Sequence, residues 1–322
     1  MAINCPPDLQ ALSPTVFITG ATGFIGQRLV SALLDQGVRV RAPIRPGKKT
    51  DSRLPLACEQ IPVDLADVDK LTGIVAECSA VIYCAGSVRG RGPEDFSMAN
   101  VIGVKAILEA LEHSDCPPPL LLLSSLAASM PVISDYARSK YEGEQLLQGS
   151  HTPWTILRPP AVYGPGDREM LPILKMIRRG LLAHAGPADQ RLSLLHVDDL
   201  VTAVMTWLSA PQKCLHQTYA IDDGTPGGYN WLAIGKAVSD KKFQMIKVPR
   251  FALEGAAKIN MLFSGLFGYA PMLSPGKVRE LVQTEWLCDN REYIKATGWQ
   301  PQLDLKRGAR QLFNSKNNNT TT

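Results

Sequence analysis

The sequence predicts an α/β fold in which a doubly wound parallel sheet is followed by a smaller C-terminal lobe. Over the first 160 residues, short apolar runs alternate with segments of helical periodicity, as expected for parallel strands joined by helices. A glycine-rich loop follows the first apolar run, at the edge where such sheets bind ligands. Beyond residue 160 the alternation weakens, and proline and glycine become frequent.

Six short segments are predicted to be strands, namely residues 16–18, 38–44, 60–63, 80–84, 120–123 and 154–157. After the first run, Ile25, Leu29 and Leu33 recur every four residues, which predicts a helix that ends at Gly37. A similar spacing predicts a helix over residues 101–111. Strands that alternate with helices run parallel and are covered on both faces, which gives the Rossmann arrangement.

The same pattern divides the chain into lobes. We expect residues 12–160 to form a dinucleotide-binding domain, to which residues 192–222 return. Residues 161–191 and 223–314 are expected to form a substrate lobe. Residues 315–322 are rich in asparagine and threonine, and we expect a disordered tail there.

The composition is that of an ordinary globular protein, with 45% hydrophobic and 20% charged residues. The net charge is +4 and basic residues are scattered, so we expect no nucleic-acid partner. No run of 18 apolar residues occurs, so no transmembrane segment is expected, and the first seven residues do not resemble a signal peptide. The seven cysteines form no Cys-x-x-Cys pair, which indicates reduced thiols, a cytoplasmic location and no metal site.

The glycine-rich loop has the features of a dinucleotide site. Gly20 allows a tight turn after the first strand, Gly23 lets the backbone approach a diphosphate, and Gly26 lets the next helix pack closely. The helix N-terminus then faces the anion. We expect the cofactor to contact Gly20, Thr22, Gly23, Phe24, Ile25 and Gly26.

The end of the second predicted strand indicates which dinucleotide binds. An NAD site usually has an acidic residue there, whereas this chain has Arg41, Arg45, Lys48 and Lys49. Guanidinium and ammonium groups suit a 2′-phosphate, so we expect NADP, with NAD as the alternative. Arg45 is the first candidate for the phosphate and Arg41 the second, unless these residues form only a solvated basic loop. Asp64, after the third strand, is placed to accept the adenine amino group.

Tyr136 and Lys140 are the first candidates for chemistry. Their spacing of four places both side chains on one face of a helix. A nearby ammonium group favours the phenolate and lowers the pKa of a tyrosine from about 10, which suits it for proton transfer to a substrate oxygen. The alternative is a solvated lysine beside a half-buried tyrosine.

Taken together, these residues resemble the extended short-chain dehydrogenase/reductases of the NAD-dependent epimerase/dehydratase group, especially the steroid-dehydrogenase-like and dihydroflavonol-reductase-like branches. The resemblance covers about residues 15–313. It rests on residues 19–26, 63–65, 83–86, Asn100, Ser124-Ser125, Tyr136-x-x-x-Lys140, 158–167 and 196–200.

The resemblance implies roles for individual residues. Tyr136 would be the acid–base residue, and Lys140 would lower its pKa and bind the nicotinamide ribose. A serine at the end of the fifth strand would bind the reacting oxygen; Ser125 aligns best and Ser124 is the alternative. Asn100 would support the active-site helix, or would simply be satisfied near a helix start.

The resemblance also implies contacts with the cofactor and the substrate. Tyr163 would border the nicotinamide and the substrate. Arg191 would contact a diphosphate, or would form an ion pair with Asp198 or Asp199. A homodimer is expected from the family. The remaining residues expected at the cofactor are Leu65, Cys84, Ala85, Gly86, Pro159 and Val162.

Two departures from the family pattern narrow the expected reaction. Only ten residues separate Ser125 from Tyr136, whereas sugar-nucleotide enzymes usually have a longer insertion there. No acidic residue lies in 126–130, and dehydratases need such an acid.

Residues 251–273 are strongly apolar. They would form lobe core, line a pocket for an apolar substrate or touch a membrane surface.

We therefore expect an NAD(P)-dependent enzyme that interconverts an alcohol and a ketone on a small-molecule substrate. A nucleotide-sugar epimerase with tightly bound NAD is the alternative. A non-catalytic Rossmann protein that serves in an assembly is the third hypothesis.

Overall fold

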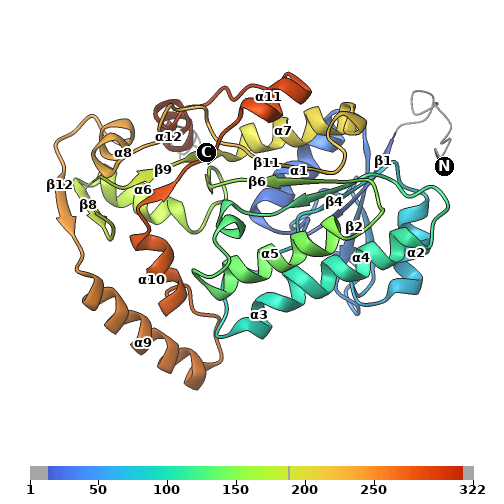
Figure 1. The fold of residues 1–322 in the computed structure, drawn as a ribbon, viewed down its shortest axis with the longest axis horizontal. Helices are drawn as coiled ribbons and strands as arrows, with labels where there is room; N and C mark the ends of the chain where they lie inside the picture. Colours follow the sequence, from blue (N-terminus) through green and yellow to red (C-terminus); the bar gives the residue numbers. More distant parts are fainter. Residues whose placement is uncertain (1–13, 188, 315–322) are drawn as a thin grey trace.

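The computed structural model describes residues 14–187 and 189–314. A seven-stranded sheet crosses its centre in the order β11-β6-β5-β4-β1-β2-β3 (Figure 1), and every neighbouring pair is parallel. The strands are β1 (Thr15–Thr19), β2 (Arg39–Ile44), β3 (Glu59–Pro62), β4 (Ala80–Tyr83), β5 (Leu120–Leu123), β6 (Trp154–Arg158) and β11 (Gln217–Ala220). The predicted doubly wound α/β fold is confirmed.

Helices cover both faces of this sheet. Along β1, Val16 and Ile18 pack into one buried cluster and Phe17 into another, because successive side chains of a strand point to opposite faces. The first cluster is closed by α1 (Phe24–Asp35), α7 (Val197–Ser209) and α11 (Arg291–Thr297). The second is closed by α2 (Val68–Ala76), α4 (Gly103–Glu112) and α5 (Asp135–Gln148).

The helix predicted over residues 101–111 has an irregular start. A short helix, α3 (Pro93–Ser97), continues through a π-helical turn, η1 (Met98–Ile102), before α4 begins. The Tyr83 hydroxyl donates to the carbonyl of Ala99 at 2.6 Å, and Gly103 leaves room for it, since a Cβ there would lie 2.2 Å from that hydroxyl. Apolar spacing alone gives no sign of this turn, which carries Asn100.

The C-terminal part forms a third buried cluster around Trp231 and Leu174. Its elements are α6 (Met170–Arg178), β8 (Leu181–His184), α8 (Trp231–Val238), β12 (Gln244–Lys247) and α12 (Leu305–Asn314), and β8 pairs in parallel with β12. Two small parallel pairs join β7 (Ala161–Tyr163) to β10 (Leu194–His196) and β9 (Arg191–Leu192) to β13 (Glu285–Trp286). Within residues 192–222, α7 and β11 thus lie on the large sheet, whereas β10 pairs with β7 instead. The short 3₁₀ helices are η2 (Leu126–Ser129) and η3 (Pro211–Lys213).

The last two helices of the lobe are α9 (Arg250–Phe267) and α10 (Pro275–Val282). The expectation that the apolar segment 251–273 forms lobe core is wrong for α9, because its only buried residues are Ala257 and Ser264. The tail expected to be disordered lies outside the described residues. Within them, no helix combines the length and the apolar content needed to cross a bilayer.

The cysteines differ from expectation at one position. Cys116 is disulfide-bonded, so the prediction of reduced thiols throughout is wrong there. Absence of a Cys-x-x-Cys pair excludes a local motif but gives no information on pairing between distant segments. The free thiols among the described residues are Cys58, Cys78, Cys84, Cys214 and Cys288.

Candidate active site

The glycine loop connects β1 to α1 and lies against the end of β4. Gly20 has φ +66°, and a Cβ there would lie 2.6 Å from the Ala85 nitrogen. A Cβ at Gly26 would lie 2.1 Å from the Gly20 carbonyl oxygen. Gly23 precedes the first residue of α1 and supplies no side-chain cap, so backbone N–H groups at this terminus suit an anion. The loop therefore fits a dinucleotide diphosphate.

The other predicted loop residues lie in the same turn. Thr22, Phe24 and Ile25 are all partly exposed, and Gln27 donates from Nε2 to the Thr22 carbonyl at 2.8 Å. At the end of β4, the Ala85 N–H donates to Thr19 Oγ1 at 3.1 Å. These contacts hold the end of β4 beside the loop.

The basic residues in β2 and directly after it lie in two different environments. Arg41 forms ion pairs with Glu59 at 2.9 Å and with Glu77 at 2.7 Å, and these carboxylates raise the pKa of its guanidinium. The expectation that Arg41 faces a phosphate is wrong, because two carboxylates already engage it. Arg45 directly follows β2 and is exposed.

The third strand ends near the predicted adenine contact. Asp64 is exposed, and its Oδ1 accepts from the Ala66 N–H at 3.0 Å. Leu65 is partly buried against the cluster beneath α2 and α4. Both residues lie at the carboxyl edge of the sheet, as the fold requires for a cofactor contact.

Helix α5 carries the predicted catalytic pair. The Ser134 hydroxyl caps the helix by accepting from the Ala137 N–H at 3.0 Å, so Tyr136 lies in the first turn and Lys140 one turn later. Lys140 is buried, and its Nζ donates to the Leu123 carbonyl at 3.0 Å. Its amine also lies next to Gly86, where a Cβ would be 3.1 Å from Nζ.

The two candidate serines have different partners. Ser125 hydrogen-bonds Tyr136 and caps η2, accepting from the Ala127 N–H at 3.2 Å. Ser124 is buried and donates to Glu144. Glu144 is fully buried on α5 and is held by Arg158, whose Nε lies 2.9 Å from Oε1. The structure thus brings Ser125, and not Ser124, to Tyr136.

Asn100 anchors the active-site helix to the loop after β4. From the π-helical turn, its Nδ2 donates to the Ser87 carbonyl at 3.1 Å and to Ser139 Oγ at 2.9 Å. Its Oδ1 accepts from the Ser87 N–H at 3.3 Å. The side chain is 2% exposed, so Asn100 supports this region from within and does not face the open site.

The pKa values in the site are set mainly by burial. Burial raises the pKa of Tyr136 to about 12, a hydrogen bond with Ser125 opposes this rise, and the charge of Glu280 adds to it. Burial lowers the pKa of Lys140 to about 8, against the opposing influence of Cys84 and Glu144. The expected lowering of the Tyr136 pKa by Lys140 is wrong for this structure, because removal from water raises that pKa and outweighs the opposing effect of Ser125.

The C-terminal lobe contributes residues that sequence reasoning missed. Glu280, on α10, accepts from the Ser134 hydroxyl at the start of α5 and pairs with Lys277 at 2.9 Å. Arg279 donates to the carbonyl of Ile133 at 2.7 Å. Glu280 lies 146 positions from Ser134, so no local pattern could have found it. Glu144, four residues after Lys140, was detectable by helical spacing.

The predicted nicotinamide-pocket residues lie in different settings. The Pro159 carbonyl accepts from the Leu126 N–H at 2.9 Å, directly after Ser125. Val162 is partly exposed on β7, and it packs with Cys84 against the cluster closed by α1. Tyr163 is fully buried, with its hydroxyl donating to the Asp304 carbonyl at 3.3 Å. The expected contact of Tyr163 with substrate is wrong, because the ring belongs to the lobe core.

The position of Arg191 excludes one of the two roles expected for this residue, the ion pair with Asp198 or Asp199. Arg191 is exposed on β9. The expected alternative, an ion pair with Asp198 or Asp199, is wrong: Asp198 binds Arg28, with Nε–Oδ1 at 3.1 Å, and the carboxylate of Asp199 accepts the N–H of Leu303 at 2.8 Å.

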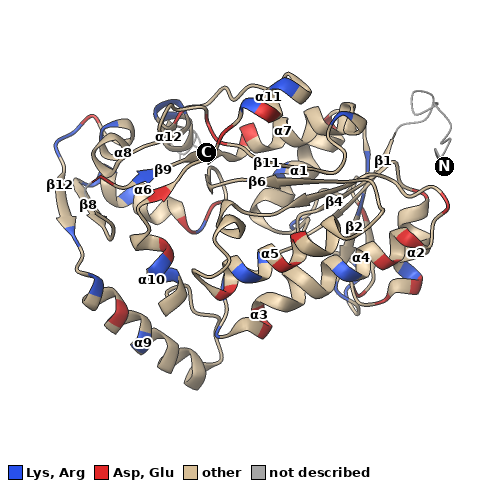
Figure 2. Ribbon diagram, in the orientation of Figure 1, with Lys and Arg blue, Asp and Glu red and all other residues tan. Residues whose placement is uncertain are grey.

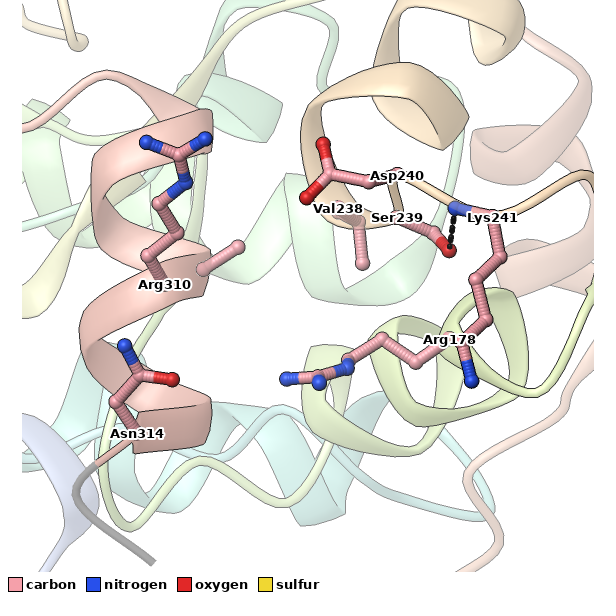
Figure 3. Close-up of a pocket in the computed structure, with 8 residues that line it drawn as sticks. Arg178, Val238, Ser239, Asp240, Lys241, Arg310 and Asn314 are labelled. Atoms are coloured by element: carbon pink, nitrogen blue, oxygen red, sulfur yellow. Dashed lines mark hydrogen bonds between the residues drawn. The ribbon is translucent and has the colours of Figure 1, made fainter.

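A separate pocket of about 340 Å³ lies between α6, α8 and α12 (Figure 3). Arg178, Lys241, Arg310 and Asp240 line it, and none of the predicted site residues does. Among residues 14–187 and 189–314, no cluster of three metal-ligating side chains occurs.

Comparisons with known proteins show which family this chain resembles. The profile of the NAD dependent epimerase/dehydratase family matches residues 16–221. A ceramide reductase of Caulobacter vibrioides is 31% identical over 274 residues, covering 84% of this chain and 85% of the relative. A 4-hydroxy-2-methyl-3-oxo-4-farnesyl-3,4-dihydroquinoline-1-oxide ketoreductase of Stigmatella aurantiaca is 24% identical, covering 65% of this chain and 68% of its own.

Among solved structures, the UDP-glucuronic acid 4-epimerase of Bacillus cereus, in complex with UDP-glucuronic acid and NAD, superposes with a TM-score of 0.70. The two chains are 18% identical, and the match covers 94% of this chain and 99% of that one; at this identity it supports the fold alone. The glycine loop, the sheet order and the matched profile lead to one conclusion: this chain belongs to the NAD-dependent epimerase/dehydratase family.

Proposed function

We propose that this protein is an NAD(P)-dependent oxidoreductase of the extended short-chain dehydrogenase/reductase type that interconverts an alcohol and a ketone on an apolar substrate. The observation that carries the proposal is the convergence of Ser125, Tyr136 and Lys140 at the carboxyl edge of the sheet. Ser125 hydrogen-bonds Tyr136, and Lys140 lies one helical turn away, beside Gly86.

The proton transfer follows from the state of Tyr136. With a pKa of about 12, its hydroxyl is protonated at neutral pH and donates to the carbonyl oxygen of a ketone as that oxygen becomes an alcohol. The Ser125 hydroxyl donates a second hydrogen bond to the same oxygen and stabilises the charge that develops there. In the opposite direction, Tyr136 accepts the proton of the alcohol.

Lys140 assists by holding a positive charge close to the developing phenolate. Its ammonium group is stable below about pH 8, the pKa to which burial lowers it. When the phenol gives up its proton, the attraction between the two charges lowers the free energy of the phenolate. Protonated Lys140 therefore favours the step at neutral pH and loses this effect at alkaline pH.

The glycine loop and the ends of β4 and β5 would hold the cofactor. When bound, a nicotinamide dinucleotide supplies the hydride chemistry. The diphosphate would contact the N-terminus of α1, and Lys140 would contact the nicotinamide ribose. We propose NADP as the preferred form, because exposed Arg45 follows β2 without an acidic neighbour in residues 44–47.

The apolar character of the substrate is supported by the relatives. The two relatives described above are named as reductases of a ceramide and of a farnesylated quinoline.

The type of reaction is supported by the short segment between Ser125 and Tyr136. Residues 126–130 contain no acidic side chain, which a dehydratase would require. An alcohol–ketone exchange needs no group beyond Ser125, Tyr136, Lys140 and the dinucleotide.

The proposal is tested with a thermal-shift panel followed by turnover measurements. The panel contains NADP, NAD, a UDP-sugar and long-chain ketones, and we expect shifts with NADP and with an apolar ketone. Tyr136→Phe should bind cofactor normally and turn over roughly 100-fold or more slowly. Ser125→Ala should lower kcat, whereas Ser124→Ala should lower stability with a smaller effect on kcat. Undiminished turnover in Tyr136→Phe, or a response to the UDP-sugar alone, would reject the proposal.

A further inference from the structure

Helix α9 presents an apolar face to solvent. Its two buried residues lie on one side, and large apolar side chains occupy the opposite side, as the 3.6-residue period of the helix dictates. We call these exposed residues the α9 face, namely Phe251 (76% exposed), Ile259 (58%), Leu262 (67%), Phe263 (48%), Leu266 (72%) and Phe267 (73%). A water-soluble helix normally has the reverse arrangement, so this face is built to meet an apolar surface.

The α9 face continues into neighbouring segments. All four residues of β12 are exposed, among them Met245 and Ile246. Beyond the helix, Tyr269 and Met272 are each 40% exposed. Figure 1 shows α9 at the outer edge of the molecule, away from the large sheet. Exposed apolar side chains therefore also occur in the segments directly before and after α9.

Charged residues of α9 are confined to its first half, where Figure 2 shows them beside an uncharged second half. Arg250 pairs with Glu254 at 2.7 Å, and exposed Lys258 forms no ion pair with any residue that the structure describes. Lys247 is exposed just before the helix. The flank of the apolar face thus carries a net positive charge.

From these observations we infer that the α9 face docks on the surface of a lipid bilayer that contains anionic lipids. An apolar face with a basic flank is the pattern of a helix that lies in the membrane interface, and anionic headgroups attract the flanking basic residues. Pairing of two copies through this face would bring like charges together. The described helices cannot span a bilayer, so α9 lies on it.

The docking would place the candidate active site beside its substrate. The segment after α9 folds back, with Asn260 Nδ2 donating to the Leu273 carbonyl at 3.0 Å, and leads into α10. There Glu280 binds Ser134 at the start of the helix that carries Tyr136. This deepens the proposed function, on which it rests: an apolar substrate would enter from the bilayer without crossing water.

The test is flotation of the full chain with lipid vesicles. We expect binding to phosphatidylcholine vesicles that contain phosphatidylglycerol and weaker binding to pure phosphatidylcholine. The triple variant Leu262→Gln, Leu266→Gln, Phe267→Gln should reduce binding roughly 100-fold, since each apolar side chain contributes to insertion. The matched control is Leu56→Gln with Leu232→Gln, which removes two other exposed apolar side chains and should bind like the unmodified chain.

Two further measurements separate the outcomes. The triple variant should keep its thermal midpoint and its turnover of a short, water-soluble ketone, but lose turnover of a long-chain ketone held in vesicles. Normal turnover of the short ketone without any vesicle binding would overturn the inference and leave the proposed function intact. Vesicle binding without turnover of any ketone would support membrane docking and reject the proposed function. Sedimentation that shows a dimer dissociated by the triple variant, with no binding to vesicles, would assign the face to a second copy.

Discussion

Replacing Arg158 by methionine is a direct test of what holds the active-site helix to the sheet. Glu144 on α5 is fully buried, and its charge is balanced by Arg158 on β6, which is 22% exposed. The substitution leaves a buried carboxylate with the hydroxyl of Ser124 as its remaining hydrogen-bond partner. Loss of one partner of a buried pair costs about 3–5 kcal/mol, and we expect the lower end, because water can enter where Arg158 was partly exposed.

A loss of about 3 kcal/mol corresponds to a fall in Tm of roughly 4–5 °C for a chain of this size, measurable by differential scanning calorimetry. Removing both charges with Glu144→Leu and Arg158→Met should restore at least half of the loss, because no unpaired charge remains. Arg28→Met, which breaks the more exposed pair with Asp198, should cost less than about 1 kcal/mol. The reasoning fails if Arg158→Met resembles Arg28→Met, or if the double variant is less stable than either single one.

Three further predictions concern the cofactor loop and the lysine. Arg45→Ala should weaken NADP binding about tenfold or more relative to NAD, measured by calorimetric titration, because a charge-assisted contact with the 2′-phosphate is lost; an unchanged ratio would contradict this. Since Lys140 loses its proton near pH 8, reductive kcat/KM should fall as pH rises through that value, and Lys140→Arg should move the fall to higher pH; coincident profiles would exclude Lys140 as its source. Gly26→Ala should abolish dinucleotide binding and lower the Tm, because its Cβ meets the Gly20 backbone at 2.1 Å. Gly73→Ala, where a Cβ meets nothing within 4 Å, should instead raise stability by about 0.4–1 kcal/mol.

Strands such as β1, β4 and β5 were predictable because each is a short run of buried apolar residues, a local signal that parallel burial on two faces imposes. Strand β11 gives no such signal, because Tyr219 is its one buried residue. The π-helical turn was not predictable, since it arises where Tyr83 reaches the carbonyl of Ala99, a contact between distant segments. Periodicity fixes which face of a helix is buried but not whether one turn contains an extra residue.

The candidate site was also only partly predictable from the sequence. Tyr136 and Lys140 were predictable from spacing within one helix. The choice between Ser125 and Ser124 needed the position of Glu144, which takes up Ser124. Arg41 was the second candidate for the phosphate after Arg45, and only the pairing of β2 with β3 brings Glu59 beside it.

The contact between α10 and α5 limits how the lobe can be exchanged. The Ser134 hydroxyl caps α5 by accepting from the Ala137 N–H, and it also donates to Glu280 on α10. One hydroxyl group thus links two segments that are distant in sequence. A chimera that takes its C-terminal segment from a relative would replace the surface of this lobe, but it would also remove the support at the start of the helix that carries Tyr136 unless an acceptor is kept at position 280. For protein engineers, Glu280 is therefore the residue to carry over in any graft of this lobe.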